Sequence, residues 1–168
     1  MCFRRRRTLT RRPSRRTTAG ERRAEARRRG QEFRARTEWV EFDRTTALLK
    51  EAVRITEDAS FYWHKGVDFE ELKESIRKDL REKRLARGGS TITQQLAKNL
   101  YLTPSKNPLR KLREYFIARR LEKALSKDRI FALYLNLIEF GPGIFGVQAA
   151  ARDYFGRDVA DLSLEEIV

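Results

Sequence analysis

Helical periodicity, interrupted by short breaks that carry capping residues, is the feature that most constrains this chain from about residue 37 onward. Asp68 and Glu71 form an N-terminal capping pattern, after which apolar residues recur at steps of three and four as far as Leu80. Ser90 is placed to cap a following helix whose apolar face includes Ile92. No run of alternating apolar and polar residues suggests a convincing strand. The sequence therefore predicts a mostly α-helical fold.

The second half of the chain continues the same pattern. Pro108 suits the first turn of a long helix, because its missing N–H is not needed there. We expect that helix to bury one apolar stripe, made of Leu109, Leu112, Phe116, Ile117, Leu121 and Leu125. Further helices are predicted over residues 128–138 and 148–154, on either side of the Gly-Pro-Gly break at residues 141–143.

A capping box lies close to the end of the sequence. Ser163 and Glu166 have the S-x-x-E spacing that announces a helix, and the chain ends two residues later at Val168. We therefore expect residues 37–168 to form a C-terminally incomplete domain. A length of 168 residues gives room for one domain with a modest core and little more.

Positive charge is concentrated at the N-terminus. Residues 1–36 hold 15 arginines and three glutamates, a formal charge of +12, which leaves only +2 of the total +14 for residues 37–168. The first 36 residues contain few large apolar side chains, so we expect a disordered Arg-rich tail. Two interpretations of this tail stay open, namely an electrostatic arm for anionic lipid or nucleic acid and a solvated segment without a function.

Several classes of protein are excluded by composition. Cys2 is the only cysteine, so neither a disulfide framework nor a cysteine-based zinc site is supported. No window reaches the roughly 20 apolar residues that span a bilayer, and the N-terminus lacks the apolar region of a secretory signal. With a single histidine in the sequence, carboxylates must carry any catalysis.

Two of these carboxylates lie in an unusual segment, residues 55–72. Glu57 and Asp58 are followed closely by Phe61, Tyr62 and Trp63. A carboxylate held against aromatic rings is desolvated and becomes a competent general base or acid. The plainer alternative is that Glu57 caps a helix or pairs locally.

Two further segments carry groups suited to an anionic ligand. Ser90, Thr91 and Lys98 surround a Gly-Gly turn and a helix start, where backbone N–H groups can hold a phosphate. Basic residues then gather near Glu114 around the start of the long helix, and they are Lys106, Arg110, Lys111 and Arg113. These cations could neutralise a pyrophosphate, although a helix cap and a solvated basic face explain the same patterns.

Together, the segments resemble one family. The first signature of the peptidoglycan glycosyltransferases, glycosyltransferase family 51, reads E-D-x-x-F-x-x-H-x-G-x-D, and residues 57–68 match it as EDASFYWHKGVD. Residues 88–102 resemble the second signature with GGSTITQQLAKNLYL, and residues 110–122 resemble the third with RKLREYFIARRLE. Residues 127–155 match the fourth. Four signatures in order make chance an inadequate explanation.

The resemblance implies a lysozyme-like, mostly helical glycosyltransferase domain on the outer face of the bacterial cytoplasmic membrane. The implied partners are lipid II, which is the acceptor, and a growing undecaprenyl-pyrophosphate-linked glycan, which is the donor. Glycan strands for the cell wall would be polymerised with release of undecaprenyl pyrophosphate. Family members usually carry an N-terminal membrane anchor before the segment seen here as WVEFDR, residues 39–44, and a fifth signature after the fourth. Neither is visible in this sequence.

Roles carry over by position. Glu57 would take the proton from the acceptor 4-hydroxyl, and Glu114 would act near the donor pyrophosphate. Residues predicted to contact substrate are Asp58, Ser90, Thr91, Gln94, Lys98, Lys106, Arg110, Lys111 and Arg113. His64 and Asp68 match fixed positions and are expected to hold the loop. No cofactor is demanded by the sequence and no metal ligand is assigned, although some family members use Mg²⁺ or Mn²⁺ at the pyrophosphate.

Three alternatives remain. An Arg-tail nucleic-acid-binding protein would bind any polyanion in a salt-sensitive way, but it leaves the four signatures unexplained, so no specific nucleic-acid partner is expected. A lysozyme-like hydrolase would cut glycan with one glutamate as its acid. An inactive fragment of a glycosyltransferase would retain the signatures without turnover.

Overall fold

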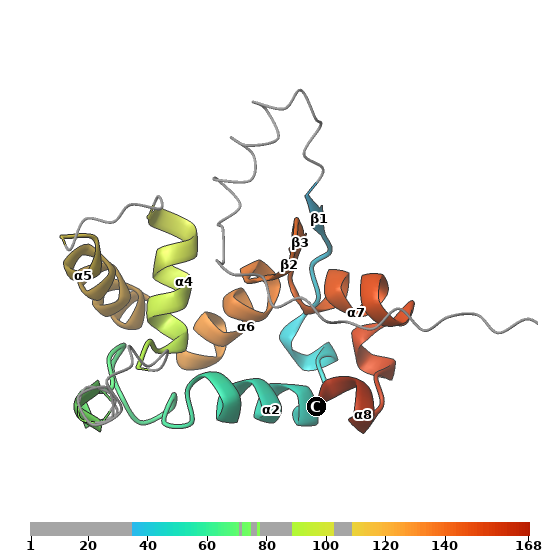
Figure 1. Cartoon of the computed structure of the whole chain (residues 1–168), viewed down its shortest axis with the longest axis horizontal. Coiled ribbons are helices and arrows are strands. Elements are labelled where there is room, and N and C mark those ends of the chain that lie inside the picture. Colours follow the sequence, from blue (N-terminus) through green and yellow to red (C-terminus); the bar gives the residue numbers. More distant parts are fainter. Residues whose placement is uncertain (1–34, 71, 75–76, 78–88, 103–108) are drawn as a thin grey trace, which may run out of the picture.

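The computed structural model describes residues 35–70, 72–74, 77, 89–102 and 109–168, and it confirms a mostly helical fold (Figure 1). Its helices are η1 (Phe42–Arg44), α2 (Ala47–Glu57), α4 (Ile92–Tyr101), α5 (Leu109–Ala124), α6 (Lys127–Leu137), α7 (Val147–Phe155), η2 (Val159–Asp161) and α8 (Leu164–Ile167). Three very short strands complete the described elements, and they are β1 (Arg36–Thr37), β2 (Glu139–Gly141) and β3 (Ile144–Phe145).

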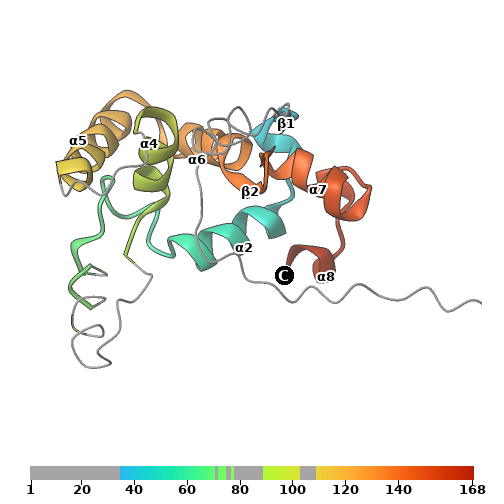
Figure 2. The same ribbon diagram turned by 45° about the horizontal axis from the view of Figure 1, so that its top comes forward.

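Helix α6 is the centre of the hydrophobic core. Its Ile130, Phe131 and Leu135 are at most 1% exposed, and Ile92 and Leu96 of α4 are fully buried beside them. In both ribbon views α6 lies between the α4–α5 pair and α7 (Figures 1 and 2). Burying each such side chain contributes about 1.5–3 kcal/mol, so this packing sets the relative positions of α4 and α5.

The predicted helix ends agree with the structure where local signals are strong. Helices α6 and α7 lie within one residue of the predicted ranges 128–138 and 148–154. Ser163 precedes α8, and its N–H donates to the Glu166 carboxylate at 2.9 Å, as the capping box predicted. Of the helix predicted after Asp68, residues 69–70, 72–74 and 77 are helical, whereas Glu71 and Leu80 lie outside the described residues.

A small sheet is the first feature that sequence reasoning missed. Strand β3 lies between β1 and β2, with β1 parallel and β2 antiparallel to it. Strands of two or three residues are too short to display alternation, which explains the omission. The predicted Gly-Pro-Gly break is the turn between β2 and β3, and Gly143 has a φ of 76° there. Arg36, placed in the predicted tail, belongs to β1.

The apolar face of α5 is the second correction. Leu109, Leu112 and Phe116 were predicted to be buried, but each is more than half exposed. Glu114 and Ala118 are instead the buried residues of α5, one turn apart on the face that packs against α4. Apolar residues occur on more than one face of this helix, so periodicity alone did not identify the face that is buried.

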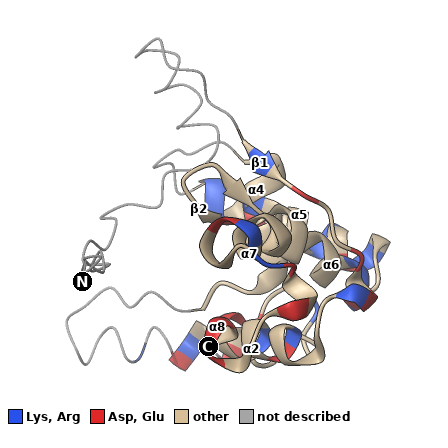
Figure 3. Cartoon of the chain, turned by 90° about the vertical axis from the view of Figure 1, so that its right-hand side faces the viewer, with Lys and Arg blue, Asp and Glu red and all other residues tan. Residues whose placement is uncertain are grey.

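Charge is mixed over the described residues. Figure 3 shows basic and acidic residues near one another along α2, α7 and α8, in keeping with the small net charge of residues 37–168. Within the described part of the chain, no helix has the length and apolar character needed to cross a membrane.

Candidate active site

The loop that follows α2 is anchored to α4 by a buried carboxylate. Asp58 is only 1% exposed, and its Oδ2 accepts a hydrogen bond from the Ile92 N–H at 2.9 Å. Ile92 is the first residue of α4, where backbone N–H groups have no partner within the helix. Asp58 supplies that partner, so it fixes the end of α2, where Glu57 lies, against the start of α4.

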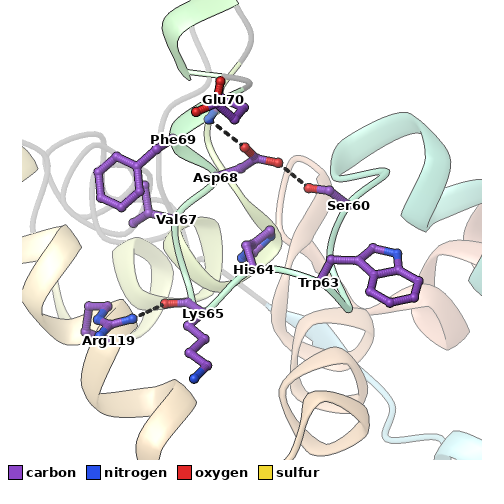
Figure 4. A pocket seen from close by; sticks show the side chains of 9 residues that line it. All are labelled: Ser60, Trp63, His64, Lys65, Val67, Asp68, Phe69, Glu70 and Arg119. Atoms are coloured by element: carbon purple, nitrogen blue, oxygen red, sulfur yellow. Dashed lines mark hydrogen bonds between the residues drawn. The ribbon is translucent and has the colours of Figure 1, made fainter.

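His64 and Asp68 hold the rest of this loop, as predicted. His64 Nε2 lies 3.0 Å from Asp58 Oδ2, and its Nδ1 accepts from the Gly66 N–H at 3.0 Å. The neutral ring with its proton on Nε2 satisfies both bonds. Asp68 accepts from the Ser60 hydroxyl and, at 2.9 Å, from the Glu70 N–H, as Figure 4 shows. The loop therefore has a conformation fixed by side-chain contacts at several points.

Glu57 is partly buried and has a specific neighbour, Gln95. Gln95 Nε2 donates to Glu57 Oε2 at 2.9 Å and to the Ser90 carbonyl oxygen at 3.3 Å. On its other side, Gln95 Oε1 accepts from the Tyr134 hydroxyl at 3.3 Å. The resemblance implied a substrate contact for the adjacent Gln94, which stays a prediction, whereas Gln95 was given no role.

The N-cap of α4 gives the two glutamines different surroundings. Thr91, not Ser90, is the N-cap, and its Oγ1 accepts from the Gln94 N–H while Gln94 Oε1 accepts from the Thr91 N–H, both at 3.1 Å. Gln94 therefore occupies the third position of a capping box, and Gln95 is left to face Glu57. The T-x-x-Q spacing of Thr91 and Gln94 is a sequence signal that could have separated the two glutamines.

Three residues predicted to contact substrate are interior residues. Asp58, Thr91 and Gln94 are all less than 5% exposed, and their side chains bond within the protein. The Thr91 hydroxyl, for example, donates to the Gly66 carbonyl oxygen at 2.7 Å. Direct contact with a substrate has no structural support at these positions. Their observed contacts position the loop and α4.

Glu114 lies in a different environment from Glu57. Its side chain is 4% exposed, and it forms an ion pair with Lys111, one turn earlier on α5. The ammonium group of Lys111 also donates to Ser90 Oγ at 3.1 Å, which joins α5 to the residue that precedes the N-cap of α4. Lys111 itself is about half exposed, so this cation is accessible from outside.

Both predicted catalytic glutamates are therefore linked to Ser90. Glu57 reaches the Ser90 carbonyl through Gln95, and Glu114 reaches the Ser90 hydroxyl through Lys111. Three signatures that are separate in the sequence thus meet at one exposed serine. The chemical result is one carboxylate beside a neutral amide and a second beside an ammonium group.

The remaining predicted cations are placed unevenly. Arg113 is exposed on α5, and Lys98 is partly buried in the last turn of α4. Arg110 has a buried Nε atom without a hydrogen-bond partner, the single such side-chain atom among the residues that the structure describes. Lys106 lies outside the described residues.

The aromatic residues after Glu57, which were expected to surround its carboxylate, lie in different environments. Phe61 is fully buried against Phe131, with ring centroids 5.5 Å apart. Trp63 is 88% exposed and lines a surface pocket of about 390 Å³ whose lining includes neither Glu57 nor Glu114 (Figure 4). The structure gives Glu57 a hydrogen bond from Gln95 as its specific contact. This amide contact replaces the expected setting of aromatic rings around the Glu57 carboxylate.

Tyr62 ties the same loop to α6. Its hydroxyl donates to Asp128 Oδ1 at 3.0 Å, in the first turn of that helix. Partial burial, followed by this hydrogen bond to a carboxylate, raises the pKa of Tyr62 to about 12. Tyr62 therefore stays a neutral donor at physiological pH.

The residues around Glu114 do not by themselves suit a divalent cation. Mg²⁺ and Mn²⁺ prefer several oxygen ligands, whereas the donor set here is one buried carboxylate already paired with Lys111. No cluster of three or more histidine, cysteine, aspartate or glutamate side chains that could hold a metal occurs within the described ranges. We assign no chemical step to a metal, and its participation stays a prediction.

Comparison with known proteins identifies relatives over most of the chain. The sequence model of the transglycosylase family matches residues 22–168. A biosynthetic peptidoglycan transglycosylase of Nitrosospira multiformis is 47% identical over 131 residues, which cover 78% of this chain and 57% of the relative. Proteins of the same name from Nitrosomonas eutropha and Aromatoleum aromaticum are 48% and 50% identical over 128 and 120 residues, which cover 76% and 71% of this chain and 52% of each relative.

The extent of these matches has two consequences. The chain spans about half the length of the curated relatives it matches. The family match begins at residue 22, inside the predicted tail of residues 1–36, so the domain boundary at residue 37 stays a prediction. Because the match covers well over half of the sequence, the chain belongs to the transglycosylase family.

Proposed function

We propose that this chain carries a peptidoglycan glycosyltransferase site that polymerises lipid II into glycan strands and releases undecaprenyl pyrophosphate. One observation carries the proposal most directly: Glu57 and Glu114 are both linked to Ser90 but have different partners, a neutral amide and an ammonium group. The reaction needs one carboxylate that accepts a proton and one region that stabilises negative charge. The relatives named biosynthetic peptidoglycan transglycosylase support the same reaction class.

The proposed step balances as a single displacement. Glu57 takes the proton of the acceptor 4-hydroxyl while that oxygen bonds to the anomeric carbon of the donor sugar. The bond from the anomeric carbon to pyrophosphate breaks at the same time, with inversion, and the electron pair leaves on the pyrophosphate. Lys111, Arg110 and Arg113 are the cations that would stabilise this charge. Glu114 would hold the Lys111 ammonium in place through their ion pair.

A lipid-linked substrate implies a location. Both donor and acceptor would be held by undecaprenyl chains in a bilayer, so we propose that the site works at the outer face of the bacterial cytoplasmic membrane. The exposed Lys111 and Arg113 would face anionic groups of the substrate there. No specific nucleic-acid partner is proposed.

Glu57→Gln tests the proposal, because it removes the base and keeps the side-chain shape. Polymerisation of lipid II, followed by separating glycan products by size, should fall by about 10²- to 10⁴-fold. Glu51→Gln on the same helix is the matched control, since Glu51 is exposed and forms only an exposed pair with Arg54. Circular dichroism should show the same unfolding temperature for both variants. Near-normal turnover by Glu57→Gln would contradict the assigned role.

Substrate choice separates the alternatives. A glycosyltransferase lengthens glycan from lipid II, whereas a lysozyme-like hydrolase shortens preformed peptidoglycan. A nucleic-acid-binding protein would instead show salt-sensitive binding to polyanions that is lost when residues 1–36 are removed. Degradation of preformed glycan without any polymerisation would overturn the proposal in favour of the hydrolase.

A further inference from the structure

The neighbour of Glu57 is itself held from the core of the domain. Gln95 contacts Glu57 on one side and Tyr134 on the other, and Tyr134 is a core residue of α6 that is only 3% exposed. We propose that Tyr134 and Gln95 are positioning residues, which together fix the direction of the Glu57 carboxylate. This inference rests on the proposed function and names residues to which neither the sequence nor the relatives gave a role.

The three hydrogen bonds of Gln95 select one orientation of its amide. A primary amide presents two N–H donors on one side and an oxygen acceptor on the other. The Glu57 carboxylate and the Ser90 carbonyl can only accept, so both require Nε2, at the observed 2.9 and 3.3 Å. The Tyr134 hydroxyl donates to Oε1 at 3.3 Å. Rotating the amide by half a turn would direct its oxygen at the carboxylate and lose both Nε2 bonds.

Tyr134 gives this arrangement a rigid support. Its ring packs in the core next to Phe131, with centroids 6.5 Å apart, so the hydroxyl has little freedom to move. Glu57, by contrast, is the last residue of α2 and has a long, partly exposed side chain. Engaging Glu57 Oε2 through Gln95 restricts the side chain to one direction relative to α4. A general base must be held within hydrogen-bond reach of the proton it takes, so such restriction favours the reaction step.

Tyr134→Phe is the most conservative test, because it removes one oxygen and keeps the buried ring. In lipid II polymerisation, we expect kcat to fall by about three- to tenfold, as for the loss of one neutral hydrogen bond, with KM almost unchanged. Tyr154→Phe is the control, which removes the same hydroxyl from a half-exposed ring. Its hydroxyl also makes a 3.3 Å bond, to the Phe140 carbonyl, and it belongs to α7, which lies on the other side of α6 from α4 and α5 (Figure 1). Equal kcat values for Tyr134→Phe and the control would overturn the inference.

A double-mutant cycle tests whether Tyr134 acts through Gln95. Gln95→Met keeps the length of the side chain and removes both the donor and the acceptor. If the two residues act in series, Tyr134→Phe will have no further effect on kcat in the Gln95→Met background. Fully additive losses would show that Tyr134 affects turnover by another route and would refute the positioning role. Unfolding temperatures of all variants serve to separate loss of fold from loss of position.

A spectroscopic measurement decides the geometry independently of activity. In protein labelled with ¹⁵N, the side-chain NH₂ signals of Gln95 should shift in Glu57→Gln relative to wild type, because the acceptor of the Nε2 hydrogen bond changes from a carboxylate to an amide. They should also shift in Tyr134→Phe, which removes the donor to Gln95 Oε1, and stay unchanged in Glu51→Gln. Gln95 signals that respond to Glu57→Gln in a protein that does not polymerise lipid II would refute the proposed function and retain the contact. Gln95 signals that do not respond to Glu57→Gln would refute this inference even in an active enzyme.

Discussion

Replacing Asp58 by alanine should destabilise the domain more than almost any other single substitution of a charged residue. The side chain is completely buried and receives hydrogen bonds from the Ile92 N–H at 2.9 Å and from His64 Nε2 at 3.0 Å. The Ser60 hydroxyl adds a longer contact of 3.4 Å. Alanine removes the acceptor but leaves both nitrogen donors in place, so the donors would be buried without partners.

The magnitude follows from those two donors. A buried donor that loses its partner costs about 1–3 kcal/mol, so two such donors together cost about 2–6 kcal/mol. We therefore expect Asp58→Ala to lower the free energy of unfolding by about 4 kcal/mol, a large share of the roughly 5–15 kcal/mol typical of a domain. Asp58→Asn keeps one oxygen for the Ile92 N–H and should cost about half as much.

Urea unfolding followed by far-ultraviolet circular dichroism measures these values. Asp161→Ala is the control, because Asp161 is exposed in η2, and it should change the unfolding free energy by less than about 0.5 kcal/mol. A value for Asp58→Ala within about 1 kcal/mol of wild type would refute the anchoring role. Normal stability combined with lost turnover would instead restore the sequence-based prediction that Asp58 contacts the substrate.

Two further predictions concern the scaffold. Gly66 has a φ of 93°, and an added Cβ would lie 3.1 Å from Glu122 Cγ, so Gly66→Ala should cost about 1–3 kcal/mol in urea unfolding. Gly156→Ala, with a φ of 68° and open space around the Cβ, should cost less, and equal costs would contradict the contact argument. Hydrogen bonds from the Ala160 N–H and the Gln148 amide lower the pKa of Asp158. Because its folded-state pKa is lowered, the ionised Asp158 stabilises the fold at pH values above the unfolded pKa of about 3.9. The difference in unfolding free energy between wild type and Asp158→Asn should therefore shrink as the pH falls below that value. A difference that stays constant with pH would disprove this linkage.

Local signals predicted those parts of the fold whose causes are local. The ends of α6 and α7 and the capping box of α8 follow from residues within one turn of each helix end. The three-stranded sheet depends on pairing between residues 36–37 and 144–145, more than 100 positions apart, and its strands are too short to reveal a pattern. The buried face of α5 likewise depends on its packing against α4, which no single-helix pattern contains.

At the candidate site, the structure brings residues of three signatures together at Ser90, and the functions predicted for them stay predictions. Within the second signature, Gln94 completes a buried cap, while the adjacent Gln95 faces Glu57. A single step along a helix turns the side chain by about 100°, so two adjacent glutamines of one signature have different surroundings. The aromatic segment after Glu57 was interpreted as its environment, yet Phe61 points into the core and Trp63 toward solvent.

Burial separates two kinds of signature residue that the sequence pattern treats alike. Asp58, Thr91 and Gln94 are interior, and their polar atoms are used to fix the loop and α4 in place. Residues of the other kind keep accessible surface and lie together at the start of α4. They are Glu57, Ser90, Gln95 and Lys111. A substitution in the first kind should act through stability, whereas one in the second kind should act through turnover in a domain that still folds. Measuring stability and turnover on the same variants therefore assigns each fixed position to scaffold or to chemistry, which a match to the signatures alone cannot do.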